Sequence, residues 1–128
     1  MTRRRDPAIL LEGIERAGAK IKRYTQGMDF GAFLDNEQTQ DAVERNFEII
    51  GEALNSLHKI SPELVERIPD TKEIIGFRHV LIHDYDHIDL NIVWASATRD
   101  LPKLLATVRE LLTELDLAAE SDSGPEPF

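Results

Sequence analysis

The sequence contains no cysteine and no long apolar run. Without cysteine in its 128 residues, the chain has neither a disulfide framework nor a thiolate site, which fits a cytoplasmic protein. No apolar run approaches the roughly 18 residues that a bilayer-spanning helix needs, so we expect no membrane insertion. The basic N-terminus resembles a signal peptide only in its charge, because Glu12 and Glu15 interrupt the apolar region that would follow.

Further patterns that the sequence lacks limit the fold classes and metal sites to be considered. The sequence shows no internal repeat, no β-type alternation and no Glu-x-x-His pair of a bundle di-iron site. Its length suits one core, and we predict a single domain over residues 1–117. Residues 118–128 lack apolar periodicity, which predicts a disordered acidic tail.

The charge is unevenly distributed. The net charge is −9, yet residues 1–23 carry +4 and the remainder −13. An acidic surface repels phosphate and argues against nonspecific coating of nucleic acid. The basic end permits a local phosphate-binding surface, and the acidic remainder permits a face for a basic protein partner.

Apolar residues at alternating spacings of four and three predict amphipathic helices in the first half of the chain. One begins at Asp6-Pro7 and stops at Gly27. After a possible single turn within residues 28–34, Asp35 or Asn36 caps a second helix. Its apolar residues are Val43, Phe47, Ile50, Leu54 and Leu57.

The second half is predicted to be helical as well. Ser61-Pro62 opens a short helix, and Asp70 to Glu73 resembles an acidic capping box for the next helix. Asp89 caps a long helix in which we expect a kink at Pro102. These faces are most simply buried in an all-α fold, an antiparallel four-helix bundle with a short extra helix.

Groups able to do chemistry crowd into residues 78–85. Arg78 offers an anion clamp, His79 and His83 exchange protons near neutral pH, and Tyr85 carries a modifiable hydroxyl. On a regular helix Arg78 and His83 point about 140° apart. To act on one substrate, either the helix distorts before His83 or a second chain shares the cleft.

Two other interpretations of these residues stay open. The second helix carries an acidic row of Asp41, Glu44, Glu48 and Glu52, for which Arg45 and Arg78 are the candidate cations. Arg78 could simply pair with Glu48 or Glu52; alternatively, Glu52 could orient Arg78 for function. In addition, His79, His83 and His87 recur every four residues, as in zinc-binding helices. No Glu follows His79, so the metal motif is incomplete.

Arg78-x4-His83-x-Tyr85 resembles the motif of the HepT-like toxins in the HEPN domain superfamily. The resemblance spans roughly residues 8 to 112 and includes, in the family's order, Phe33-Leu34-Asp35, Ile49-Ile50-Gly51-Glu52-Ala53, Ile75-Gly76-Phe77-Arg78, His83-Asp84-Tyr85, Val93-Trp94 and Asp100-Leu101-Pro102. The family usually has a smaller polar residue at the position of His79. In this chain His79 either faces solvent, the interpretation that we favour, or helps to position phosphate.

The resemblance implies a HEPN-like bundle and a metal-independent endoribonuclease without cofactor, acting as a homodimer. Arg78 would clamp the phosphate and His83 would be the acid or base. The chain would be the toxin of a type VII toxin–antitoxin system. A minimal nucleotidyltransferase antitoxin would neutralise it by attaching AMP to Tyr85. The alternative is a non-catalytic dimeric module that binds such a partner.

Overall fold

The structure is a computed structural model that describes residues 6–83 and 88–122. For residues 78, 79, 81–83 and 120–122 it describes the backbone alone. Within these ranges every regular element is a helix, which confirms the all-α prediction. No helix in these ranges combines the length and apolarity required to cross a bilayer.

The first helix begins and ends where the sequence predicts. Helix α1 (Pro7–Thr25) is capped by Asp6, whose carboxylate accepts a hydrogen bond from the Ala8 N–H at 2.9 Å. Pro7 occupies a position whose N–H would have no partner within the helix. Gly27 follows with φ +79°, a left-handed conformation that costs glycine little.

The second long helix also matches its prediction. A single turn, α2 (Phe30–Leu34), precedes α3 (Glu37–Ile60). The Asn36 side chain accepts a hydrogen bond from the Thr39 N–H at 2.9 Å and so caps α3. All five predicted apolar residues of α3 are fully buried.

A short helix then leads to the motif helix. Helix α4 (Pro62–Glu66) is followed by α5 (Thr71–His83). Asp70 has φ 61°, and its carbonyl accepts a hydrogen bond from the Ile74 N–H at 3.1 Å. A capping box needs extended backbone at the cap residue, so the backbone at Asp70 differs from that predicted.

The predicted last helix is divided by a π-turn. Asp89 caps α6 (Leu90–Ala95), η3 (Ser96–Asp100) is a π-helical turn, and α7 (Leu101–Asp122) follows. The regular α-helical pattern is thus interrupted just before Pro102 by a π-turn, a feature that commonly accompanies helix kinks. In that turn the Leu101 N–H donates to the Ser96 carbonyl. Pro102 becomes the second residue of α7, where a missing N–H is tolerated.

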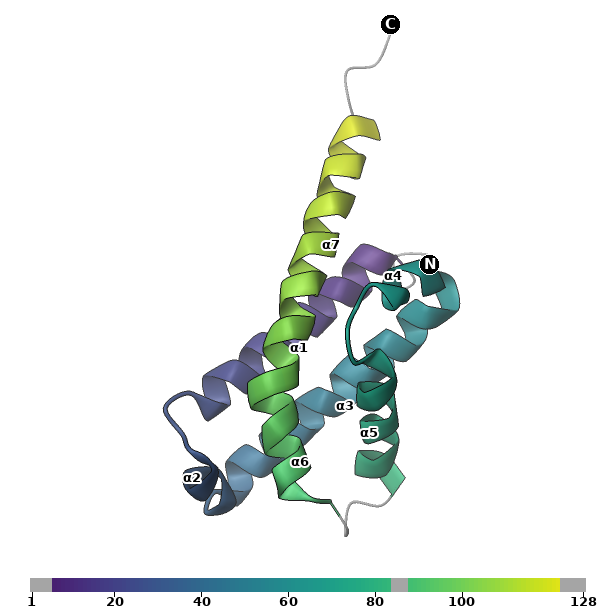
Figure 1. Ribbon diagram of the computed structural model, residues 1–128. Coiled ribbons are helices and arrows are strands. Elements are labelled where there is room, and N and C mark those ends of the chain that lie inside the picture. The colour runs from purple at the N-terminus through teal and green to yellow at the C-terminus, as the bar shows by residue number, and fades with distance from the viewer. Residues whose placement is uncertain (1–5, 84–87, 123–128) are drawn as a thin grey trace, which may run out of the picture.

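The predicted boundary of the disordered tail is wrong at its start. Helix α7 continues through residues 118–122 to Asp122, projecting beyond the other helices (Figure 1). Ala118 and Ala119 are strong helix formers, and no breaker precedes Gly124, so the helix needs no buried face to continue. Residues 123–128 lie outside the described part of the chain.

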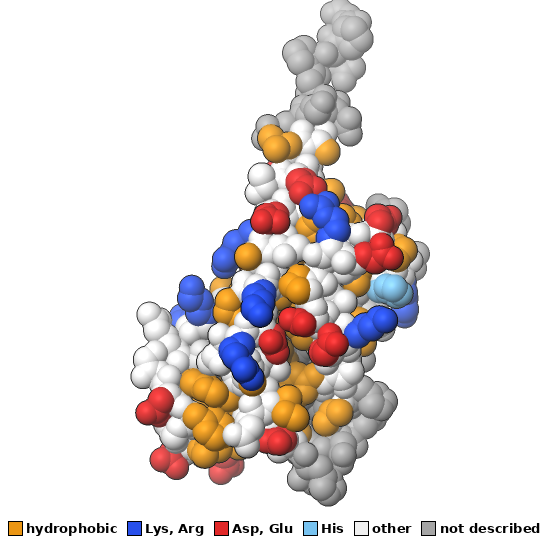
Figure 2. Space-filling model, in the orientation of Figure 1, with side chains coloured by type: hydrophobic (Ala, Val, Ile, Leu, Met, Phe, Trp, Pro, Cys, Tyr) orange, Lys and Arg blue, Asp and Glu red, His pale blue; other side chains and the backbone are white. Residues whose placement is uncertain are grey.

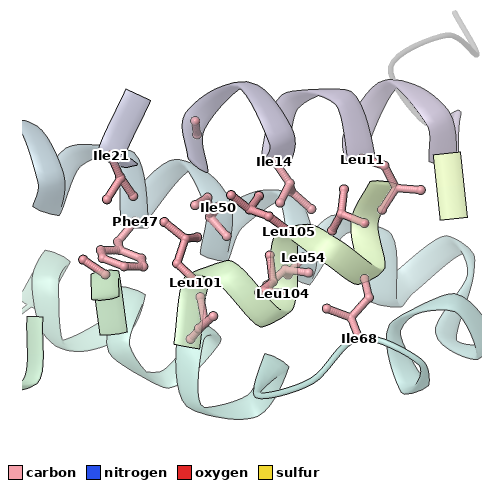
Figure 3. Close-up of a cluster of buried hydrophobic side chains, with 14 of the residues drawn as sticks. Leu11, Ile14, Ile21, Phe47, Ile50, Leu54, Ile68, Leu101, Leu104 and Leu105 are labelled. Atoms are coloured by element: carbon pink, nitrogen blue, oxygen red, sulfur yellow. The ribbon is translucent and has the colours of Figure 1, made fainter. Parts of the chain in front are cut away.

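The helices pack around one core, with α3 between α1 and α5, and α7 against α1 (Figure 1). Figure 3 shows side chains from α1, α3 and α7 meeting in this core, including Ile14, Ile50 and Leu104. Arg67, just after α4, donates to both carboxylate oxygens of Glu114 at 2.8 and 2.6 Å. Hydrogen bonding to Glu114 raises the pKa of Arg67 and lowers that of Glu114. This exposed pair links the end of α4 to α7.

Acidic residues on α3 lie close to the surface that packs against α5. Phe47 of α3 and Phe77 of α5 meet edge to face, with ring centroids 5.4 Å apart. Glu44, one turn before Phe47, is half-buried; burial, then the charges of Asp41 and Glu48, raise its pKa above 4.5. An ionised Glu44 therefore opposes folding at neutral pH.

Helices α1 and α7 lie close together at Gly18. A Cβ atom placed there would lie 2.5 Å from a methyl carbon of Leu105, whereas a Cβ at Gly13 would meet nothing within 4 Å. Leu105 is 3% exposed, so a shift of its side chain would disturb its packing in the core. The contact depends on the absence of a side chain at position 18.

We expect Gly18→Ala to destabilise the protein by about 1 kcal/mol, since overpacking outweighs the gain in helix propensity. The matched variant Gly13→Ala should instead stabilise it by up to about 1 kcal/mol. Urea unfolding followed by circular dichroism measures both. Equal stabilisation by the two variants would contradict the tight contact.

Glu44→Gln should raise the free energy of unfolding at pH 7 by about 0.5 kcal/mol, the scale of a like-charge pair on a helix. Because the folded-state pKa is raised, the native carboxylate keeps a proton that the unfolded chain has lost, and stability falls as pH rises from 4.5 through the folded pKa. Below that window the variant and the parent should converge. A benefit that persists undiminished at pH 3 would exclude this electrostatic cause.

Candidate functional site

The motif lies on a regular α-helix that runs through His83. Helix α5 is α-helical from Thr71 to His83, so its backbone shows no distortion between Arg78 and His83. At about 100° per residue the two positions are about 140° apart around the axis. Of the two arrangements that the sequence left open, distortion of the helix before His83 is not observed.

The packing of α5 fixes which side of it faces the core. Ile74 is 2% exposed and Phe77 packs on Phe47, whereas Val80 is 39% exposed. Relative to Phe77, position 78 is rotated by about 100° in one direction and position 83 by about 120° in the other. Relative to Ile74, position 78 is rotated by only about 40° and position 83 by about 180°. The backbone therefore places Arg78 beside the core-facing side of α5 and His83 on the side away from the core.

The acids of α3 divide into exposed and half-buried groups. Glu52, predicted to support Arg78, is exposed. Arg45 Nη1 lies 3.9 Å from Glu48 Oε1, with side chains 68% and 26% exposed respectively. At this distance and exposure the ion pair contributes little to stability. Arg45 therefore pairs with one acid of the acidic row, as one interpretation of the sequence expected. The role of Glu52 toward Arg78 stays a prediction.

Glu44 is an acid of α3 whose partial burial the sequence alone does not show. It belongs to the acidic row of α3, but only the packing of that helix shows it to be half-buried with a raised pKa. Its signal in the sequence is its position three residues before Phe47, on the edge of the apolar stripe. Such an edge position is partly covered once a neighbouring helix packs against the stripe.

Several predicted residues lie outside what the structure describes. Tyr85 and His87 fall within residues 84–87, and the side chains of Arg78, His79 and His83 are likewise outside the description. Their predicted roles stay predictions. Among the side chains that are described, no group of three or more His, Cys, Asp or Glu is placed to hold a metal ion.

Comparison with known proteins finds one matching family and several similar proteins. Residues 14–111 match the family described as Ribonuclease HepT-like. A protein of Methanocaldococcus jannaschii named "Putative RNase" is 35% identical over 104 residues, covering 81% of this chain and 94% of that protein. A protein of Thermococcus cleftensis named "Probable ribonuclease HepT" is 35% identical over 101 residues, covering 79% and 91%.

A longer relative is also similar. A Methanocaldococcus jannaschii protein named "Gamma-glutamylcyclotransferase and putative RNase" is 35% identical over 113 residues, which cover 88% of this chain but only 50% of that protein. The chain thus spans half the length of this relative. No solved structure matches the sequence. The match over residues 14–111 and the similarity over most of two relatives' lengths confirm the resemblance seen in the motif: the chain belongs to the Ribonuclease HepT-like family.

Proposed function

We propose that this protein is a metal-independent endoribonuclease whose catalytic residues are Arg78 and His83. The observation that carries the proposal is that a member of a ribonuclease family holds an arginine and a histidine five residues apart on one regular helix, whose Ile74 is buried and whose Val80 is exposed. No other window of the sequence combines an anion clamp with two groups that titrate near neutral pH.

The chemistry of RNA cleavage suits these residue types. A base removes the 2′-OH proton, the 2′ oxygen attacks phosphorus, and the bond to the 5′ oxygen breaks as an acid protonates it. The products are a 2′,3′-cyclic phosphate and a free 5′-hydroxyl. An imidazole can serve as the base or the acid, and a guanidinium can hold the phosphoryl oxygens as negative charge builds. We assign the first role to His83 and the second to Arg78, with His79 and Glu52 as supporting residues.

The geometry of α5 supports a site shared between two copies of the chain. Positions 78 and 83 lie about 140° apart around a regular helix, so one phosphate is more easily reached by Arg78 of one protomer and His83 of another. A two-fold dimer brings the two positions together twice. We therefore propose a homodimer with Arg78 and His83 facing each other across its cleft.

We further propose that the protein is the toxin of a toxin–antitoxin pair acting in the cytoplasm. Its partner is a minimal nucleotidyltransferase that adenylylates Tyr85. AMP on this phenol places a negative phosphate and a bulky base two residues from His83, where it competes with RNA for the Arg78 clamp. The family resemblance of the Arg78-x4-His83-x-Tyr85 motif supports this assignment.

His83→Ala should lower the rate of RNA cleavage by at least about 100-fold, the usual contribution of a general acid or base. His58→Ala, at an exposed position in the last turn of α3, is the matched control and should cleave as the parent does. The assay uses purified protein and a labelled single-stranded RNA in EDTA, with analysis of the product ends.

Three results would count against the nuclease proposal. Cleavage that requires added metal would favour the histidine cluster, and equal cleavage by His83→Ala would exclude His83 from the chemistry. A parent protein that carries no modification and leaves RNA intact would favour the non-catalytic binding module.

Tyr85 should carry AMP when the chain is produced together with its nucleotidyltransferase, and Tyr85→Phe should abolish both the modification and the protection that it gives to cells. Mass spectrometry of the purified chain measures the first effect, and growth of the producing cells measures the second. Tyr24→Phe is the matched control for a tyrosine elsewhere. Modification found at Tyr24, or protection that survives Tyr85→Phe, would refute the assignment.

A further inference from the structure

A groove with cationic sides lies between α1 and the η3–α7 junction, away from the motif helix. It has a volume of about 490 Å³. Its walls come from the last two turns of α1 and from the π-turn and first turns of α7. The residues that line it are Ala19, Lys22, Arg23, Thr25, Gln26, Ala97, Thr98, Leu101, Pro102, Leu105 and Arg109.

The lining of the groove is positively charged although the protein as a whole carries −9. None of the described residues that form it is acidic. Arg109 is partly neutralised, since its Nε donates to Glu15 Oε2 at 3.0 Å. The guanidinium of Arg23 lies 5.4 Å from the centre of the Tyr24 ring, a cation–π contact that leaves its charge intact. Lys22 and Arg23 therefore supply the positive charge.

The floor of the groove is apolar, and the backbone explains why it is open. Ala97 of η3 and Leu101 and Leu105 of α7 contribute hydrocarbon, and Gly18 brings α1 and α7 into close contact at the level of Leu105. The π-turn widens the helix just before Pro102, which has no N–H to donate to a carbonyl of the preceding turn. An apolar floor and a cationic rim match a base and a phosphate respectively.

The groove lies toward the same end of the bundle as the end of the motif helix. Because neighbouring helices run in opposite directions, α1 and α5 both finish at that end (Figure 1). In Figure 2 Lys and Arg side chains lie on both sides of the boundary between α1 and α7. An RNA strand held at the motif could therefore continue toward the groove without crossing to the opposite end of the bundle.

We propose that this groove binds one nucleotide of the RNA substrate outside the cleavage site, with Lys22 and Arg23 on its phosphate. The inference rests on the proposed ribonuclease function and extends it to a second contact. An acidic protein segment is the competing occupant. The groove volume, close to that of a small-molecule site, and the apolar floor favour a nucleotide over a folded partner.

The test measures RNA binding in a His83→Ala background, so that cleavage does not interfere. Lys22→Ala/Arg23→Ala is compared with Lys59→Ala/Lys72→Ala, which removes the same charge from exposed positions at the opposite end of the bundle. Fluorescence anisotropy of a labelled 20-nucleotide single-stranded RNA gives Kd at several salt concentrations, and circular dichroism checks that each variant is folded.

We expect the slope of log Kd against log salt to fall by about 1.4 in Lys22→Ala/Arg23→Ala, about 0.7 for each cation withdrawn from the RNA backbone, and to stay at the parent value in the control pair. An unchanged slope in the groove variant, or equal changes in both pairs, would overturn the inference. Displacement of the RNA by polyglutamate at equal charge concentration would also overturn it, in favour of an acidic segment.

The same experiment separates this inference from the proposed function. If the parent cleaves RNA but the groove variant binds with unchanged salt dependence, the nuclease stands and the groove proposal falls. If the groove variant binds RNA with the reduced slope while the parent never cleaves, the groove proposal stands and the nuclease falls.

Discussion

The unbroken α-helical backbone of α5 is the constraint on which the rest depends. Its register from Thr71 to His83 is fixed because Ile74 and Phe77 are held against the core. Once that side is fixed, position 78 lies beside it and position 83 lies on the far side of the helix, about 140° from position 78. A phosphate bound on one side of α5 can then reach either the guanidinium or the imidazole of that chain, but not both. A site shared between two chains brings both groups to one phosphate.

Helix α3 makes that register possible. It packs against both α1 and α5, and its apolar stripe is fully buried. Glu44 lies at the edge of this stripe and is half-buried as a consequence of the packing. The packing of α3 thus determines both the burial of its apolar stripe and the raised pKa of Glu44. A protein that holds a charged Glu44 there at neutral pH gives up some stability to do so.

Much of the fold could be predicted because its signals are local. The caps at Asp6, Asn36 and Asp89 depend on a side chain two or three residues from the N–H that it accepts from, and the apolar stripes need only a helical period. The π-turn before Pro102 could not be predicted from a local pattern. It lets the helix accommodate the proline while the apolar residues before and after Pro102 stay buried. The helical start of the tail escapes a prediction based on apolar periodicity, because helix propensity alone is sufficient there.

The candidate site was predictable only in part. Residue types and spacing drew attention to Arg78 and His83, but only family resemblance linked them to RNA cleavage. Burial of Glu44 and the groove beside Lys22 and Arg23 depend on which helices meet, and no local pattern of the sequence contains that information.

The most direct test of the shared site is a heterodimer of Arg78→Ala and His83→Ala chains, purified through two different tags. Each homodimer should be inactive. In the heterodimer one composite site retains both groups, so RNA cleavage should return to about half the parent rate. A heterodimer no more active than either homodimer would place both groups within one chain and contradict the account.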